Sequence, residues 1–185
     1  AKISDIYKNE TYDISKGNRL FTKAIMEMNK DKVFYPNANG TMRLTYGKIT
    51  DYAPNLSEKY TFYSTIDEMI KKEVTKPNSD LIIPDKLKEL YENKDYGNYA
   101  SDSTLKLCFL TDNDVIGGMS GAPVINGDGE IIGIIFDINW EATSSDLFFD
   151  EKYQRSIAVD IRYVLFIIDK YAEASNILKE LTLKE

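Results

Sequence analysis

The chain has 185 residues, 43% of them hydrophobic, which is enough for one domain with a core of its own. Lys and Arg number 23 against 30 Asp and Glu, so the formal net charge is −7, and the absence of a basic stripe argues against a nucleic-acid partner. The single Cys108 excludes an intrachain disulfide, and no apolar run approaches the roughly 20 residues that span a bilayer.

The sequence contains no histidine. Histidine is the usual general base for a serine or cysteine nucleophile and a frequent zinc ligand, because its pKa lies near neutrality. Any chemistry that this chain carries out alone therefore does not use imidazole. The chain also lacks a CxxC pair, and we expect neither a metal nor another cofactor.

The first half of the chain alternates between helical and extended patterns. Apolar residues from Leu20 to Met28 recur at helical spacing and predict a helix of about four turns that ends near residues 29–31. Residues 41–52 alternate and are rich in Thr, Tyr and Ile, which predicts a strand. Residues 66–74 and 85–92 predict two short surface helices separated by prolines.

The second half predicts further strands at residues 105–112, 122–126, 130–137 and 155–161, with a turn at 126–129 that joins two of them as a hairpin. This pattern favours a mostly β fold, an antiparallel barrel with flanking helices. From Tyr163 to Leu181 the period returns to 3.6 and predicts a terminal helix that packs on the barrel.

Residues 117–124 read GGMSGAPV and carry the chemistry. A serine nucleophile needs a tight loop that exposes its hydroxyl and directs backbone N–H groups at the developing oxyanion. Glycines two residues before and one residue after Ser120 allow that backbone path, and the natural donors are the N–H groups of Gly118 and Ser120. The alternative is a glycine-rich turn that carries an ordinary serine.

The order GxSGxPV, hairpin, IGI resembles the nucleophile region of chymotrypsin-like peptidases. Longer runs, among them CFLTDNDVIGGMSGAPVIN, IIGIIFDINWEA and RSIAVDIRYVLFIIDKYA, resemble the C-terminal portion of the bacterial dipeptidyl-peptidases of that clan, the group of dipeptidyl-peptidases seven and eleven. This resemblance covers nearly the whole chain.

The resemblance implies a double β-barrel catalytic domain interrupted by a helical domain that caps the cleft. Residues 1–34 would be the tail of that helical domain, residues 35–162 the second, six-stranded barrel, and residues 163–185 the terminal helix. The His and Asp of the triad would lie upstream in the same polypeptide, which explains the missing histidine. The implied location is the periplasm or the cell surface.

The resemblance also assigns roles to four residues. Ser120 would be the nucleophile and Gly118 a backbone donor of the oxyanion hole, whereas Asp137 would receive the free α-ammonium of a peptide substrate. Ile138 matches the position that lines the specificity pocket, where relatives with arginine select Asp or Glu. Isoleucine supplies no cation, and we expect a preference for uncharged residues second from the N-terminus. The isolated chain is expected to be inactive.

Two other functions fit the same motifs. An endopeptidase of the clan, glutamyl-type or housekeeping, shares GxSGxPV and IGI, and a non-catalytic relative acting in binding is suggested by Met119, where a polar residue is common. Apolar surface left by the first barrel predicts a homodimer. The acidic runs at residues 112–114 and 126–130 lack the ligand order of an EF-hand calcium loop and are better explained as turns.

Overall fold

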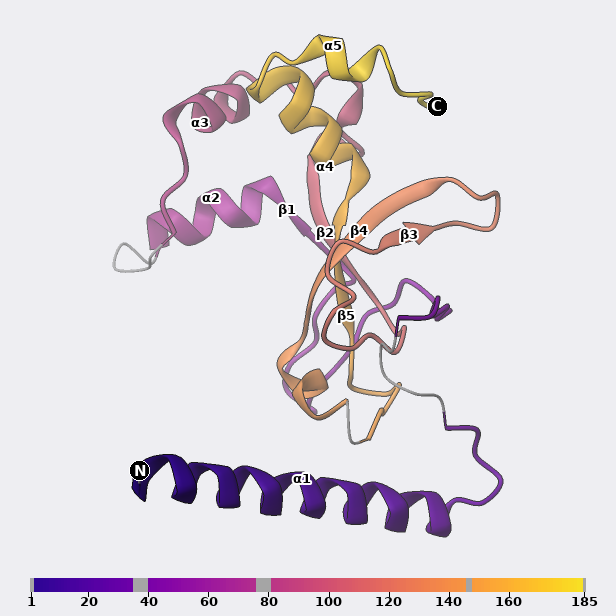
Figure 1. Cartoon of the computed structure of the whole chain (residues 1–185). Coiled ribbons are helices and arrows are strands. Elements are labelled where there is room, and N and C mark those ends of the chain that lie inside the picture. Colours follow the sequence, from indigo (N-terminus) through magenta and orange to yellow (C-terminus); the bar gives the residue numbers. More distant parts are fainter. Residues whose placement is uncertain (1, 35–39, 76–80, 146–147, 185) are drawn as a thin grey trace. The chain divides into compact units, whose positions relative to one another are not determined.

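A computed structural model describes residues 2–34, 40–75, 81–145 and 148–184, with side chains from residue 11 onward (Figure 1). The chain divides into two compact units, Ala1–Thr41 and Met42–Glu185. The first unit contains α1 (Lys2–Met28). This helix begins well before the predicted one and ends close to the predicted end. The helix ends at Met28, and the next residue, Asn29, donates from its backbone N–H and its side-chain Nδ2 to the carbonyl of Ile25 (3.1 and 2.9 Å).

The second unit contains a five-stranded antiparallel sheet in the order β1-β2-β5-β4-β3. Its strands are β1 (Tyr63–Thr65), β2 (Lys106–Thr111), β3 (Pro123–Ile125), β4 (Ile131–Ile138) and β5 (Ser156–Asp160). The four strands predicted in the second half are therefore confirmed, and so is the hairpin, since Asn126 N–H donates to the carbonyl of Glu130 (3.0 Å). β5, the last strand in the sequence, lies at the centre of the sheet.

The predicted strand at residues 41–52 is wrong. This segment makes only the isolated bridges Ile49↔Thr111 and Tyr52↔Tyr60, because it follows the end of β2 through a few irregular hydrogen bonds instead of a regular ladder. Among the described residues the sheet stays open, and the six strands of the predicted closed barrel are not found there. The mostly β character of the fold is nevertheless as expected.

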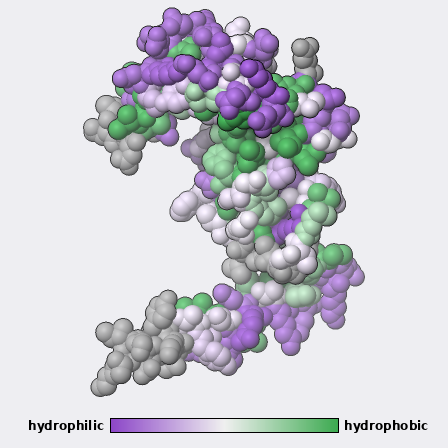
Figure 2. All heavy atoms as spheres, turned by 45° about the horizontal axis from the view of Figure 1, so that its top comes forward, coloured by the Kyte–Doolittle hydropathy of each residue, from purple (hydrophilic) through white to green (hydrophobic). Residues whose placement is uncertain are grey.

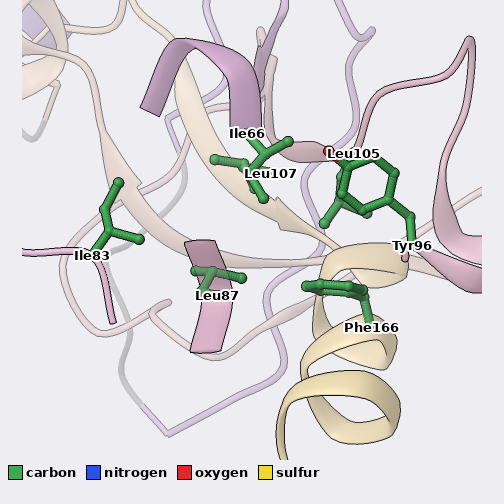
Figure 3. Close-up of a cluster of buried hydrophobic side chains, with 7 residues drawn as sticks. All are labelled: Ile66, Ile83, Leu87, Tyr96, Leu105, Leu107 and Phe166. Carbon is green, nitrogen blue, oxygen red and sulfur yellow. The ribbon is translucent and has the colours of Figure 1, made fainter. Parts of the chain in front are cut away.

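Helices pack at one end of the sheet (Figure 1). The two predicted short helices are confirmed as α2 (Ile66–Thr75) and α3 (Asp85–Glu92), and η1 (Gly97–Tyr99) follows. Together with α4 (Ile161–Phe166) they enclose the first hydrophobic core (Figure 3). The buried side chains of this core are Ile66, Ile83, Leu87, Tyr96, Leu105, Leu107 and Phe166.

The predicted terminal helix is interrupted. After α4 the chain widens into a π-helical turn, η3 (Ile167–Tyr171), and then breaks before α5 (Ser175–Leu178). The break lies at Glu173, whose φ of 55° is left-handed, and the Glu173 carboxylate pairs with Lys86 of α3 at 2.5 Å. Tyr163, Ile167 and Tyr171 still pack on the first core, so the first part of the apolar stripe is buried as expected, whereas Ile177 and Leu181 beyond the break are exposed.

A second hydrophobic core lies within the sheet and is formed by Phe109, Val115, Ile135 and Ala158. Hydrophilic residues predominate at the top of the view, over the helical end, and hydrophobic residues are more frequent nearer the sheet (Figure 2). Within the described ranges no helix combines the length and apolar character needed to span a membrane. That residues 1–34 belong to a helical cap domain and residues 35–162 to a barrel stays a prediction.

Candidate active site

The glycine-rich motif forms a tight exposed loop, residues 117–121, between the second core and β3. Two backbone hydrogen bonds close the loop on itself, from Met119 N–H to the Ile116 carbonyl (3.2 Å) and from Ala122 N–H to the Met119 carbonyl (2.9 Å). Two others attach it to β4, since Gly121 donates to Ile135 (2.7 Å) and Ile135 donates to Ala122 (2.9 Å). The loop is therefore fixed at both ends, and its glycines and Ser120 face solvent.

Met119 and Ala122 attach the loop to the second hydrophobic core. Both side chains are half-buried and pack against the second hydrophobic core, whereas Ser120 between them is exposed. Apolar side chains on each side of a polar residue direct the backbone so that the serine points outward. Met119 thus serves as an apolar anchor, a role that the sequence analysis missed and that its neighbour Ser120 requires.

Glycine is required at two positions in the loop. Gly118 and Gly121 have φ values of 93° and 88°, which residues with a Cβ atom rarely adopt. The N–H groups of Met119 and Gly121 are used in the hydrogen bonds above, but those of Gly118 and Ser120 have no acceptor within the described part of the chain. The two amides predicted for an oxyanion hole are therefore among those of the loop that have no acceptor in the described part of the chain, and the space beside Gly118 is open.

The end of β4 carries the other two predicted residues and contains a β-bulge. The pairing with β5 shifts register between Ile135 and Asp137, so that Phe136 has no partner and both Phe136 and Asp137 are exposed. A bulge changes the direction in which the next side chain points, and such bulges are common beside active sites. The Asp137 Oδ1 accepts a hydrogen bond from the N–H of Ile138 (2.8 Å), which restricts the carboxylate.

Ile138 is half-buried and packs against the same core as Met119. One apolar cluster therefore supports both the residue that precedes Ser120 and the residue predicted to line the specificity pocket. Because Gly121 and Ala122 are bonded to Ile135, the loop lies only two and three strand positions from Asp137 and Ile138, about 7 and 10 Å along β4. The four predicted site residues thus lie on two directly bonded segments.

The acidic residues considered for calcium have partners in the protein. Asn126 Oδ1 accepts from the N–H groups of Asp128 (3.0 Å) and Glu130 (2.9 Å), which is the geometry of an Asx turn. Asp112 accepts from the N–H of Lys48 (2.6 Å), and Asp114 pairs with Arg43 (3.3 Å). A hydrogen-bonded turn and contacts with Arg43 and Lys48 therefore account for these residues.

The sequence profile of the peptidase S46 family matches residues 2–183. The chain belongs to the peptidase S46 family. It is 45% identical to a dipeptidyl-peptidase 7 of Phocaeicola vulgatus over 99% of its length and 40% identical to an Asp/Glu-specific dipeptidyl-peptidase of Capnocytophaga gingivalis over the same share. It covers 26% of each of these relatives, so it spans about a quarter of their length.

A solved S46 structure agrees with the fold. The crystal structure of DPP11 from Porphyromonas endodontalis in complex with the dipeptide Arg-Asp superimposes with a TM-score of 0.79 and 40% sequence identity. The match covers 88% of this chain and 23% of that one. The resemblance found in the sequence to dipeptidyl-peptidases seven and eleven is therefore confirmed.

Proposed function

We propose that this chain is the nucleophile-bearing part of a serine dipeptidyl-peptidase, which releases dipeptides from the free N-terminus of peptides. The observation that carries this proposal is the loop of residues 117–121, in which Ser120 is exposed and the N–H groups of Gly118 and Ser120 have no acceptor among the described residues. Family membership supports the reaction class, because relatives in the S46 family are named dipeptidyl-peptidases.

In the mechanism, the Ser120 Oγ attacks the carbonyl carbon of the second substrate residue while an upstream His accepts its proton and an upstream Asp orients that His. The Gly118 and Ser120 amides stabilise the oxyanion. The protonated His then gives its proton to the leaving amine, and water hydrolyses the acyl-enzyme. The chain has no histidine, so we propose that it is inactive by itself.

Asp137 is proposed to bind the α-ammonium of the substrate. Its carboxylate is exposed at the bulge of β4 and is held by the N–H of Ile138. A fixed carboxylate accepts a charge-assisted hydrogen bond from an ammonium but gains little from a blocked, neutral N-terminus. Asp137 would therefore restrict the enzyme to free N-termini, which separates it from an endopeptidase of the same clan.

Ile138 is proposed to make the enzyme prefer an uncharged, aliphatic or small residue at the second position. Its side chain is aliphatic and packs on the second hydrophobic core, an environment that does not stabilise a buried carboxylate. The names of the relatives include both dipeptidyl-peptidase 7 and Asp/Glu-specific dipeptidyl-peptidase, so these names do not decide between an uncharged and an acidic second residue. The proposed preference is therefore based on the isoleucine at position 138.

The test compares fluorogenic dipeptide substrates in free and N-acetylated pairs, with Ala, Leu, Asp or Glu in the second position. The complete polypeptide that contains this chain, its Ser120→Ala variant and the isolated chain are assayed in parallel. We expect rapid cleavage of the free uncharged substrates and at most slow cleavage of the others, loss of that cleavage in the Ser120→Ala variant, and none by the isolated chain. Faster cleavage after Asp or Glu would overturn the preference.

The same assay tests the other functions. Equal cleavage of free and acetylated peptides indicates an endopeptidase, and absence of any cleavage together with absence of fluorophosphonate labelling of Ser120 indicates a non-catalytic relative. The packing of Met119 on the second core argues against a non-catalytic relative, because the Met119 side chain points away from the exposed Ser120 and does not cover it. The periplasmic or surface location and the homodimer stay predictions from the sequence.

A further inference from the structure

Residues 43–52 lie beside both parts of the candidate active site, and we call this segment the brace. At its start, Arg43 pairs with the carboxylate of Asp114 (3.3 Å) and also donates to the Asp114 backbone carbonyl (3.3 Å). Both side chains are nearly buried, with 14% and 11% of their areas exposed. Asp114 is followed directly by Val115 and Ile116, which are buried, and then by the loop that carries Ser120.

The middle of the brace packs on the residues that precede Asp114. Lys48 and Asp112 exchange two hydrogen bonds, from Lys48 N–H to Asp112 Oδ1 (2.6 Å) and from Asp112 N–H to the Lys48 carbonyl (3.1 Å). At Gly47 a Cβ would collide with the Asp112 side chain and lie 2.9 Å from the backbone nitrogen of Asn113. Glycine is therefore needed here for close backbone contact, and the brace is fitted tightly to the root of the loop.

The end of the brace contacts the other part of the site. Arg155, which is 5% exposed, donates to the Asp51 carbonyl (3.0 Å), and its guanidinium lies 5.7 Å from the ring centre of Tyr52. The backbone of Arg155 is bonded to Asn139, since the Arg155 N–H donates to Asn139 Oδ1 (2.8 Å) and the Asn139 N–H donates to the Arg155 carbonyl (2.9 Å). Asn139 directly follows Ile138.

Tyr52 also acts on this turn directly. Burial raises the pKa of its phenol, a hydrogen bond with the Asn139 side chain opposes that shift, and the charge of Glu141 adds to it. The Asn139 Nδ2 in turn donates to Glu141 (2.8 Å) and to the Tyr153 carbonyl (2.8 Å). The turn after β4 is therefore a hydrogen-bonded unit that the brace contacts twice, through Tyr52 at Asn139 and through Asp51 at Arg155.

We infer that the brace sets the geometry of the active site, with Arg43 as a positioning residue for the Ser120 loop and Arg155 as a positioning residue for the Asp137–Ile138 end of β4. A planar guanidinium fixes its acceptors in space more strictly than an ammonium does. Arg43 acts through Asp114. The Arg155 guanidinium donates to the backbone carbonyls of Asp51, Glu151 and Gln154 and so fixes the backbone segment that is bonded to Asn139. This inference rests on the proposed peptidase function.

The two arginines have separable effects. A displaced nucleophile slows the chemical step, because a misplacement of about 1 Å can cost roughly 100-fold in rate. A displaced β4 end changes how substrate is held and weakens binding with less effect on the reactivity of Ser120. A purely structural role would instead lower the amount of folded enzyme and leave the rate per intact site unchanged.

The experiment uses the complete polypeptide with Arg43→Lys and Arg155→Lys, which keep the charge and remove the planar guanidinium. The matched control is Arg162→Lys, because the Arg162 guanidinium also binds a carboxylate, that of Asp160, through Nε (2.9 Å) and Nη2 (2.6 Å), at the opposite end of β5 from Ser156. Three quantities are measured: amide hydrogen exchange, the rate of fluorophosphonate labelling of Ser120, and kcat and KM per titrated site.

For Arg43→Lys we expect exchange of the Met119 and Gly121 amides to rise about tenfold or more, and labelling of Ser120 to slow about 10- to 100-fold, with KM within about twofold. For Arg155→Lys we expect faster exchange of the Asn139 amide and a KM raised about fivefold or more, with labelling within about twofold. Arg162→Lys is expected to change neither the hydrogen exchange of the Met119, Gly121 and Asn139 amides nor the rate at which Ser120 is labelled.

Unchanged exchange in both variants would overturn the inference, and so would faster exchange with unchanged labelling and KM. Equal changes in all three variants would show a general loss of stability and would also overturn it. If the wild-type Ser120 is not labelled, the proposed function is wrong, and the exchange data alone decide whether the brace holds the two segments.

Discussion

The replacement of Asp137 by asparagine isolates the charge that is proposed to bind the substrate N-terminus. Asparagine has nearly the same shape and keeps an Oδ1 acceptor for the Ile138 N–H, which donates to Asp137 at 2.8 Å. The local backbone should therefore be retained, and only the negative charge is lost. Because Asp137 lies two residues beyond the loop contact at Ile135, the loop that carries Ser120 is not directly touched.

The expected loss follows from the strength of a charge-assisted hydrogen bond, about 1.5–3 kcal/mol, which corresponds to about 10- to 150-fold in kcat/KM. Asp137 is exposed in the described structure, and screening by solvent puts the expected loss at the lower end, about tenfold. N-acetylated substrates carry no ammonium, so their slow cleavage should be unchanged and the ratio of free to acetylated rates should fall about tenfold.

The assay measures kcat/KM for paired free and N-acetylated fluorogenic dipeptides, with Asp128→Asn as the control. Asp128 is an exposed carboxylate in the hairpin turn, and its replacement should alter neither rate. An equal decrease for free and acetylated substrates would refute the reasoning, because it would mean that Asp137 supports the site generally. No decrease for either substrate would also refute it.

Three further outcomes are expected. Ile138→Arg should raise kcat/KM for Asp and Glu relative to Leu in the second position by about tenfold or more, as measured with matched dipeptides. Phe166→Ala should lower the free energy of unfolding in urea by about 3–5 kcal/mol, because Phe166 is 0% exposed, whereas Phe148→Ala, at a side chain 55% exposed, should cost about 0.5 kcal/mol or less. Burial, and then the charge of Asp67, raise the pKa of Tyr96 from 10.0 to about 12, so its contribution to stability is complete below pH 10 and is lost as pH rises towards 12. Unfolding in urea at pH 9 and 11, each about 1 unit from the ordinary tyrosine pKa, should show a smaller alkaline loss for Tyr96→Phe than for wild type.

The strands and the loop were predictable because their signals are local. The alternation in residues 105–112 marks one buried face, the apolar run in residues 131–136 is typical of a strand, and the glycines around Ser120 correspond to the positive φ values at Gly118 and Gly121. The packing role of Met119 was not predicted, because the sequence analysis compared this residue only with the polar residue that is common before the nucleophile. Its position between exposed residues, three before the apolar Ala122, indicates an anchor, and both side chains pack on the second core.

The remaining features depend on contacts that a local pattern does not contain. Residues 41–52 alternate like a strand, but the close approach of Gly47 to Asp112 and Asn113 and the distant partners Asp114 and Arg155 determine their path. The bulge at Phe136 has no signal in the uniformly apolar run of β4. These are long-range effects, and they also determine whether a sheet closes.

The terminal helix illustrates a different limit. An apolar stripe predicts which side chains are buried, and its members Ile167 and Tyr171 do pack on the first core. A stripe does not report whether the backbone is continuous. The left-handed Glu173 and its ion pair with Lys86 of α3 end the π-helical turn, and the stripe residues Ile177 and Leu181 that follow are exposed.

The central position of β5 has a consequence for the order of folding. β2 pairs with β1 and β5, and β4 pairs with β3 and β5, so β5 is the strand that joins two separate two-stranded ribbons. Two-stranded ribbons are marginal alone in water. During synthesis residues up to 155 therefore leave the ribosome before β5 can join the two ribbons. We expect the site to become ordered only when Ser156–Asp160 pairs with both of them.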